Sequence, residues 1–201
     1  MRYSHCKPKE TPMKTTTALF CLTLLAACGS AENKASSSTG SSSLPTLSDA
    51  YVEDCEGNSR RRYQVKDNQV LEEVTVHEGQ DCNGREGVKI LIRYSYQKGT
   101  SLGNDTYEVE ATVHEATAFP LTAESAQGMN NIQACGATDW SQGQAKSLFG
   151  CTDGPISAGD KLYSLIRITD RELQFGEESP GRDGKTPGTR HTILDSKIAR
   201  R

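Results

Sequence analysis

Long apolar runs are missing from this 201-residue chain. The longest, from Ala18 to Ala27, is interrupted by Cys21 and Thr23. It is about half as long as the ~20 residues that a membrane-spanning helix needs. The sequence therefore predicts no membrane-spanning helix, and its length favours one globular domain with attachments.

An excess of positive charge is missing as well. The chain has a formal net charge of −3, and the part after residue 27 holds 19 Lys and Arg against 25 Asp and Glu, a net charge of −6. Nucleic-acid binding needs a basic face, so we expect no nucleic-acid partner. The basic cluster at 60–62 is opposed by Glu53, Asp54 and Glu56. We expect it to be a solvated strand end, with a lipid-headgroup or polyanion site as the alternative.

Motifs for catalysis are also missing. The sequence has no G-x-S-x-G, no H-E-x-x-H and no calcium loop of spaced aspartates. Gly184-Lys185-Thr186 resembles the end of a phosphate-binding loop, but Ser179 stands where that pattern requires glycine. Paired carboxylates such as Glu72-Glu73 are expected to be solvated. We therefore expect no enzyme activity and no catalytic, cofactor-binding or metal-binding residue.

One repeated pattern, Glu-x-Thr-Val-His-Glu, contains His77 and later His114. If the strand from Val88 lies between the two in a meander, both histidines lie at the same end of the sheet, ~9.6 Å apart. The nitrogens of two ligands on one metal ion lie within about 4 Å of each other. We therefore expect two similar solvent-facing strand ends and no metal or acid–base pair.

What is present begins with an export signal: a basic stretch over residues 1–14, then the short apolar run. Leu25-Ala26-Ala27-Cys28 resembles the lipobox of bacterial prolipoproteins. The resemblance implies removal of residues 1–27 and attachment of lipid chains to Cys28, which would anchor the protein in the bacterial cell envelope. Gly29 and Ser30 follow in place of aspartate, which by resemblance to enterobacterial sorting implies the outer membrane. The alternative is an ordinary secretory signal in which Cys28 has no role.

Residues 28–48 are expected to form a disordered linker after the lipidated cysteine. Their composition is dominated by Ser with Ala, Thr and Gly, which cannot bury a core. A flexible segment of this length has an end-to-end distance of ~25 Å. The folded domain is expected to span residues 49–201.

Seven cysteines reduce to four once Cys6 and Cys21 leave with the signal and Cys28 takes lipid. The four are Cys55, Cys82, Cys135 and Cys151. Zinc sites usually contain close C-x-x-C pairs, which this sequence lacks. An even number in an exported domain predicts two disulfides, with three pairings open. We favour Cys55–Cys82 and Cys135–Cys151, because each closes a loop within one supersecondary unit.

Alternation of apolar and polar residues predicts the strands. Between Val88 and Tyr96 the even positions are apolar or aromatic, whereas polar residues such as Lys89 and Arg93 lie between them. Strict alternation indicates antiparallel strands with one buried face. Further strands are expected at 63–65, 70–77, 107–113, 146–149, 162–169 and 173–175. One short helix is expected at 121–130, with Thr122 as its N-cap.

About eight strands indicate an all-β antiparallel up-and-down barrel, with a two-sheet sandwich as the alternative. The strand rhythm, the Asp81-Cys82 turn and the segments 173–176 and 190–195 resemble the small lipocalin-like domains of bacterial envelope lipoproteins. Trp140 is expected to fill one end of the core, with a position on a ligand-facing rim as the alternative.

The sequence is compatible with two functions. A barrel of this size is either filled by its own side chains or holds one small molecule. The first hypothesis is a small apolar ligand, with lining residues Ile90, Ile92, Tyr94, Tyr96, Tyr107 and Val109. The second is a structural or interaction module of the envelope with a filled core and no ligand. The oligomeric state is left open by the sequence.

Overall fold

The computed structural model describes residues 47–151 and 157–201. The predicted signal peptide, Cys28 and all but the last two residues of the linker lie outside the described residues. The described strands are β1 (Tyr51–Val52), β2 (Ser59–Lys66), β3 (Gln69–His77), β4 (Glu86–Gly103), β5 (Thr106–Pro120), β6 (Lys146–Ser147), β7 (Lys161–Ile168), β8 (Glu172–Glu177), β9 (Ile193–Leu194) and β10 (Ala199–Arg200). One α-helix, α1, spans Ala123–Asn131, and short 3₁₀ turns lie at Gln80–Cys82, Ala134–Gly136 and Pro187–Thr189.

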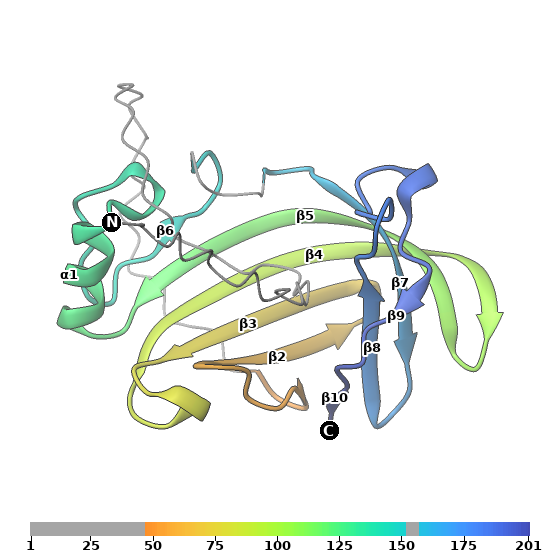
Figure 1. Ribbon diagram of the computed structural model, residues 1–201, viewed down its shortest axis with the longest axis horizontal. Coiled ribbons are helices and arrows are strands. Elements are labelled where there is room, and N and C mark those ends of the chain that lie inside the picture. The colour runs from red at the N-terminus through yellow and green to blue at the C-terminus, as the bar shows by residue number, and fades with distance from the viewer. Residues whose placement is uncertain (1–46, 152–156) are drawn as a thin grey trace, which may run out of the picture.

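Eight of these strands close into an antiparallel barrel (Figure 1). Their order around the barrel is β10-β1-β2-β3-β4-β5-β7-β8, and β10 pairs with both β8 and β1. β6 and β9 are short additions that pair with β5 and β8. Closure removes the exposed edges that an open sheet would leave. The predicted all-β up-and-down barrel is therefore confirmed, and the sandwich alternative is wrong.

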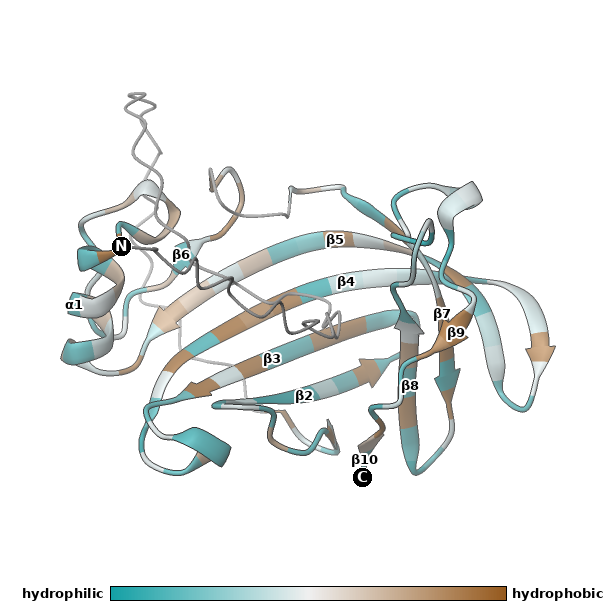
Figure 2. Ribbon diagram, viewed as in Figure 1, coloured by the Kyte–Doolittle hydropathy of each residue, from teal (hydrophilic) through white to brown (hydrophobic). Residues whose placement is uncertain are grey.

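The strands follow from the alternating pattern. Along β4, Ile92 and Tyr96 are buried in the core, and Arg93 between them is exposed. Figure 2 shows the same alternation as bands of contrasting hydropathy along β2, β3 and β4. The turn between β4 and β5 places Asn104 and Asp105 at positive φ, which matches a two-residue hairpin turn of type I′. Local turn chemistry thus supports the register that the buried face requires.

The core consists of two clusters of buried side chains. The first fills the middle of the barrel and contains Tyr51, Tyr63, Val70, Tyr96, Val109, Ala111, Ile166, Leu173 and Ala199. The second contains Ile92, Ala116, Ala118, Ala126, Ala134, Trp140 and Leu148. It lies where α1 and the segment after it cover the end of β4 and β5 that is remote from their hairpin turn (Figure 1). Trp140 is 3% exposed there, so it fills one end of the core, as predicted.

Both favoured disulfides are present. Cys55 and Cys82 join the segment after β1 to the turn after β3, with their Cα atoms 5.8 Å apart. Cys135 and Cys151 close the loop that contains Trp140, with their Cα atoms 4.4 Å apart. In the chain-entropy model, loops of these lengths each stabilise the fold by about 3 kcal/mol.

Helix α1 begins at the predicted N-cap. The Thr122 hydroxyl accepts a hydrogen bond from the Ser125 backbone N–H at 3.0 Å. We expect Thr122→Ala to lower the free energy of unfolding by about 1 kcal/mol, because one backbone donor loses its partner. Thr122→Ser, which keeps the hydroxyl, is expected to retain most of the stability in chemical denaturation. Equal losses in the two variants would contradict a capping role.

Candidate functional site

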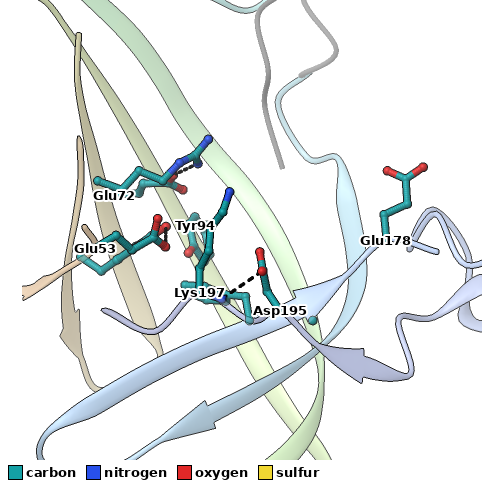
Figure 3. Close-up of a pocket in the computed structure, with 10 residues that line it drawn as sticks. Glu53, Glu72, Tyr94, Glu178, Asp195 and Lys197 are labelled. Atoms are coloured by element: carbon teal, nitrogen blue, oxygen red, sulfur yellow. Dashed lines mark hydrogen bonds and ion pairs between the residues drawn. The ribbon is translucent and has the colours of Figure 1, made fainter. Parts of the chain in front are cut away.

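A small cavity of about 40 Å³ lies inside the barrel, between the wall formed by β2, β3 and β4 and the end of β8. It is lined by Glu53, Arg61, Tyr63, Glu72, Tyr94, Phe175, Gly176, Glu178, Asp195 and Lys197. A volume of this size holds roughly three water molecules. Figure 3 shows the carboxylates of Glu53 and Glu72 near Tyr94 and Lys197, with Glu178 apart from the other labelled side chains.

An ion pair buried in the barrel forms one side of the cavity. Arg61 Nη1 lies 2.6 Å from Glu72 Oε1, and the two side chains are 13% and 3% exposed. Burial raises the pKa of the Glu72 carboxyl above its usual 4.5, while the Arg61 charge and hydrogen bond act in the opposite direction. Taking both charges out of water is costly, and their mutual attraction offsets that cost only while both are present.

A second carboxylate lies beside this pair. Backbone pairing between β1 and β2 continues to Glu53, whose N–H donates to the Arg61 carbonyl at 3.0 Å. The Tyr63 hydroxyl donates to Glu53 Oε1 at 2.8 Å. Burial raises the pKa of Glu53, and the Tyr63 hydrogen bond and the Arg61 charge reduce that rise. Among the described residues, no salt bridge within 4.0 Å includes Glu53.

Three aromatic rings complete the wall. The Phe175 ring centroid lies 5.1 Å from that of Tyr63 and 6.5 Å from that of Tyr94. Burial raises the pKa values of both tyrosines, and the Glu72 carboxylate raises them further. Both tyrosines therefore stay neutral near pH 7, and they line the cavity as uncharged side chains.

The rim is formed by the segment that crosses from β9 to β10. The Asp195 N–H donates to the Phe175 carbonyl at 2.8 Å, and its carboxylate accepts the Lys197 backbone N–H at 3.0 Å. The Lys197 ammonium lies 2.5 Å from Glu56, a residue outside the cavity lining. Glu178 is exposed, so the cavity inside the barrel opens to solvent at this rim.

The six side chains predicted to line a ligand site do not lie together around this cavity. Tyr94 lines it. Tyr96 and Val109 are buried in the first core cluster, and Tyr107 packs against them. Ile92 belongs to the second cluster, with Ile90 packed against it. The predicted set is therefore divided between the middle of the barrel and the end that α1 covers.

Sequence reasoning missed the charged residues of the site. The cluster at 60–62 was expected to be a solvated strand end, which is wrong for Arg61, because it points inward beside Tyr63. Glu72 and Glu73 were expected to be solvated, yet both are only 2% exposed. Glu73 lies on the outer side of β3, where Arg62 and Lys89 pair with it. One feature of the sequence could have predicted that Arg61 points inward. Arg61 and Tyr63 are two residues apart, so they share one face of a strand.

The two histidines lie far apart. His77 pairs with Glu86 at the start of β4, and the His114 ring bonds to Ser95, nine residues further along the same strand. At about 3.4 Å per residue this separation is roughly 30 Å. The predicted placement at one end of the sheet is wrong, because β5 continues beyond His114 to Pro120. His77 is also buried and not solvent-facing.

A second hollow of about 320 Å³ lies on the other side of β2 and β3. Its lining is Val52, Arg60, Arg62, Glu73, Thr75, His77 and Glu86. The buried carboxylate in it, Glu73, has two basic partners, Arg62 and Lys89. This hollow thus offers a charged surface whose buried carboxylate is already paired.

The described part of the chain contains neither a group of metal-ligating side chains nor a membrane-spanning helix. Within residues 47–151 and 157–201, no three His, Cys, Asp or Glu side chains are placed to hold a metal ion. Within the same ranges no helix has the length and apolar character to cross a membrane. The chain matches no protein-family model and no curated protein sequence.

Proposed function

We propose that this protein is anchored by lipid on Cys28 in the bacterial cell envelope, at the outer membrane, and that its barrel binds a small ligand without catalysing a reaction. The observation that carries the ligand proposal is the cavity inside the closed barrel, where charged side chains meet aromatic rings. The anchor rests on the sequence Leu25-Ala26-Ala27-Cys28. The absence of hydrolase and nucleotide-binding motifs from the sequence supports binding over catalysis.

The lining favours a ligand with a polar or charged group over the wholly apolar ligand expected from the strand pattern. Six of the ten lining residues are ionisable, and two others are tyrosines. An apolar molecule placed here would desolvate these groups without giving them hydrogen bonds, which is unfavourable. A ligand that supplies the missing partner avoids that cost.

Native mass spectrometry of the full chain, purified in a mild detergent, tests the ligand proposal. We expect a small molecule to remain bound to part of the purified protein and to be released on unfolding. A spectrum with only the lipid-modified chain, from cells grown in rich medium, would contradict it.

Replacing Cys28 tests the anchor. We expect Cys28→Ser to abolish labelling by radioactive palmitate and to move the protein from the membrane fraction to the soluble fraction, because the thioether lipids can no longer form. Cys21→Ser, in the same leader, is the matched control and should leave both unchanged. Unlabelled wild-type protein, or a variant that still carries label, would contradict lipidation at Cys28.

One observation favours the second candidate, a structural or interaction module. The middle of the barrel is filled by Tyr51, Tyr63 and Tyr96, and the outer hollow is larger than the inner cavity. Chemical crosslinking in intact cells would support this function if a partner were captured through Arg60 or Arg62 and no ligand co-purified.

A further inference from the structure

We propose that the ligand is a small organic cation with a primary ammonium group, held by the Glu53 carboxylate beside the rings of Tyr63, Tyr94 and Phe175. This inference deepens the proposed ligand-binding function and rests on it. It assigns Glu53 as the residue that recognises the ligand, and it gives the ligand a charge and a size.

The balance of charge around the cavity selects a cation. Its lining carries four carboxylates, from Glu53, Glu72, Glu178 and Asp195, against the two cations of Arg61 and Lys197. Arg61 is paired with Glu72, and the Lys197 ammonium is directed to Glu56 outside the lining. Among the described residues Glu53 forms no ion pair within 4.0 Å, and the charges of Arg61 and Lys197 act on this half-buried carboxylate only from a greater distance. An anion placed here would meet net negative charge.

Hydrogen bonding selects a primary ammonium group. Glu53 Oε1 already accepts the Tyr63 hydroxyl, and Oε2 accepts no hydrogen bond from the described residues. An ionised carboxylate has about four acceptor positions, and an ammonium group has three donors. A quaternary ammonium has no N–H to donate, and its four carbon substituents keep the charge away from Glu53.

The aromatic rings suit the same group. The faces of tyrosine and phenylalanine attract a cation within about 6 Å of the ring centroid. Tyr63, Tyr94 and Phe175 meet at this cavity, with centroid separations of 5.1 and 6.5 Å. Aromatic walls with a carboxylate at one side stabilise an ammonium group and the first carbons attached to it.

The size of the cavity limits the ligand. A volume of about 40 Å³ accommodates the ammonium group and the adjoining carbons. A longer chain has to leave past the rim at Glu178, which is exposed. We therefore expect linear amines to bind and branched amines of the same carbon number to bind weakly.

Isothermal titration of the detergent-solubilised full chain with n-butylammonium, 1-butanol and butyrate tests the inference. We expect n-butylammonium to bind at pH 7, and the neutral and anionic compounds of similar size to bind at least tenfold more weakly. Glu53→Gln should weaken n-butylammonium binding at least tenfold. Asp54→Asn removes the same charge one residue away, outside the lining, and should change affinity by less than twofold. Thermal unfolding of each variant checks that the barrel is intact.

The pH dependence gives a second readout. Because burial raises the pKa of Glu53, protons compete with the ligand for this carboxylate as the pH is lowered from 7 toward 4.5. Affinity for n-butylammonium should fall over this range in the wild type and much less in Glu53→Gln.

The alternative outcomes are separable. Binding of butyrate in place of n-butylammonium would show that the ligand is not a cation. It would leave the proposal of ligand binding intact. No binding of n-butylammonium, or equal binding to wild type and a folded Glu53→Gln variant, would also overturn the inference. The co-purified ligand sought by native mass spectrometry decides the proposed function independently of these results.

Discussion

Replacing Arg61 with methionine is expected to lower the free energy of unfolding by about 3–5 kcal/mol at pH 7, because it leaves the Glu72 carboxylate buried without its cation. The Glu72 side chain is 3% exposed, and the few water molecules that the adjoining cavity can hold do not supply the compensating positive charge. The exposed pair Arg93–Glu115 gives the matched control. Arg93→Met should change stability by less than about 1 kcal/mol, because both side chains of this pair are exposed to solvent. Chemical denaturation with the disulfides intact measures both.

The double variant Arg61→Met/Glu72→Leu separates the buried charge from the lost packing. Removing both charges is expected to restore most of the stability, because neither ion then remains unpaired. A double variant as unstable as Arg61→Met would show that the loss comes from other contacts of Arg61 and not from Glu72.

The effect of Arg61→Met should also depend on pH. Without Arg61, nothing offsets the burial that raises the pKa of Glu72. A carboxyl whose pKa is higher in the folded than in the unfolded state stabilises the fold when protonated, and that stability is lost as the pH rises through the folded pKa. The destabilisation should therefore be largest at pH 7 and shrink as the pH is lowered toward 4.5, the usual pKa of this carboxyl. A loss of stability that is constant with pH would contradict an uncompensated Glu72.

Replacing Trp140 with alanine is expected to lower the free energy of unfolding by about 3–5 kcal/mol, the usual cost of emptying the site of a large buried ring. Trp140 is 3% exposed in the second core cluster. Its ring N–H donates to the Ala134 carbonyl at 2.9 Å, and its backbone is held by the Asn130 side chain. Trp140 thus joins α1, through Asn130, to a segment with little regular structure. Denaturant unfolding, followed by far-UV circular dichroism, measures the loss.

Two controls accompany Trp140→Ala. Trp140→Phe keeps much of the apolar volume and loses the hydrogen bond to Ala134, so we expect a loss about half as large. Ile132→Ala, at a neighbouring apolar residue that is 51% exposed, should change stability by about 0.5 kcal/mol or less. If Trp140→Ala were as mild as Ile132→Ala, Trp140 would not be an important contact of the second cluster.

Several features of this fold could be predicted from the sequence because each depends on neighbouring residues. Alternation along 88–97 and 107–113 located β4 and β5, since a strand with one buried face has period two. Thr122 marked the start of α1 because capping acts over three residues. The cysteine spacing indicated the two disulfides, which close short loops.

The boundaries of the longest strands were harder to predict. β4 extends to Gly103 through a polar stretch that does not alternate, and it is held by pairing with β5. β10 has only two residues, too few to show any period, yet its pairing with β1 and β8 closes the barrel. Pairing with segments that are distant in the sequence decided where β4 ends and where β10 forms.

The candidate site separates more clearly the features that neighbouring residues predict from those that only distant pairing decides. By itself the sequence determined that this chain forms antiparallel strands with one apolar face, since hydrophobic burial imposes the period. Only the tertiary structure decided that Arg61 points inward, that Glu72 meets it, and that Glu53, 19 residues from Glu72, lies beside them through the pairing of β1 with β2. The physical reason is that period two assigns residues to faces without saying which face is enclosed. Closure of the barrel makes that choice, and it turns charges that look solvated in the sequence into a buried site.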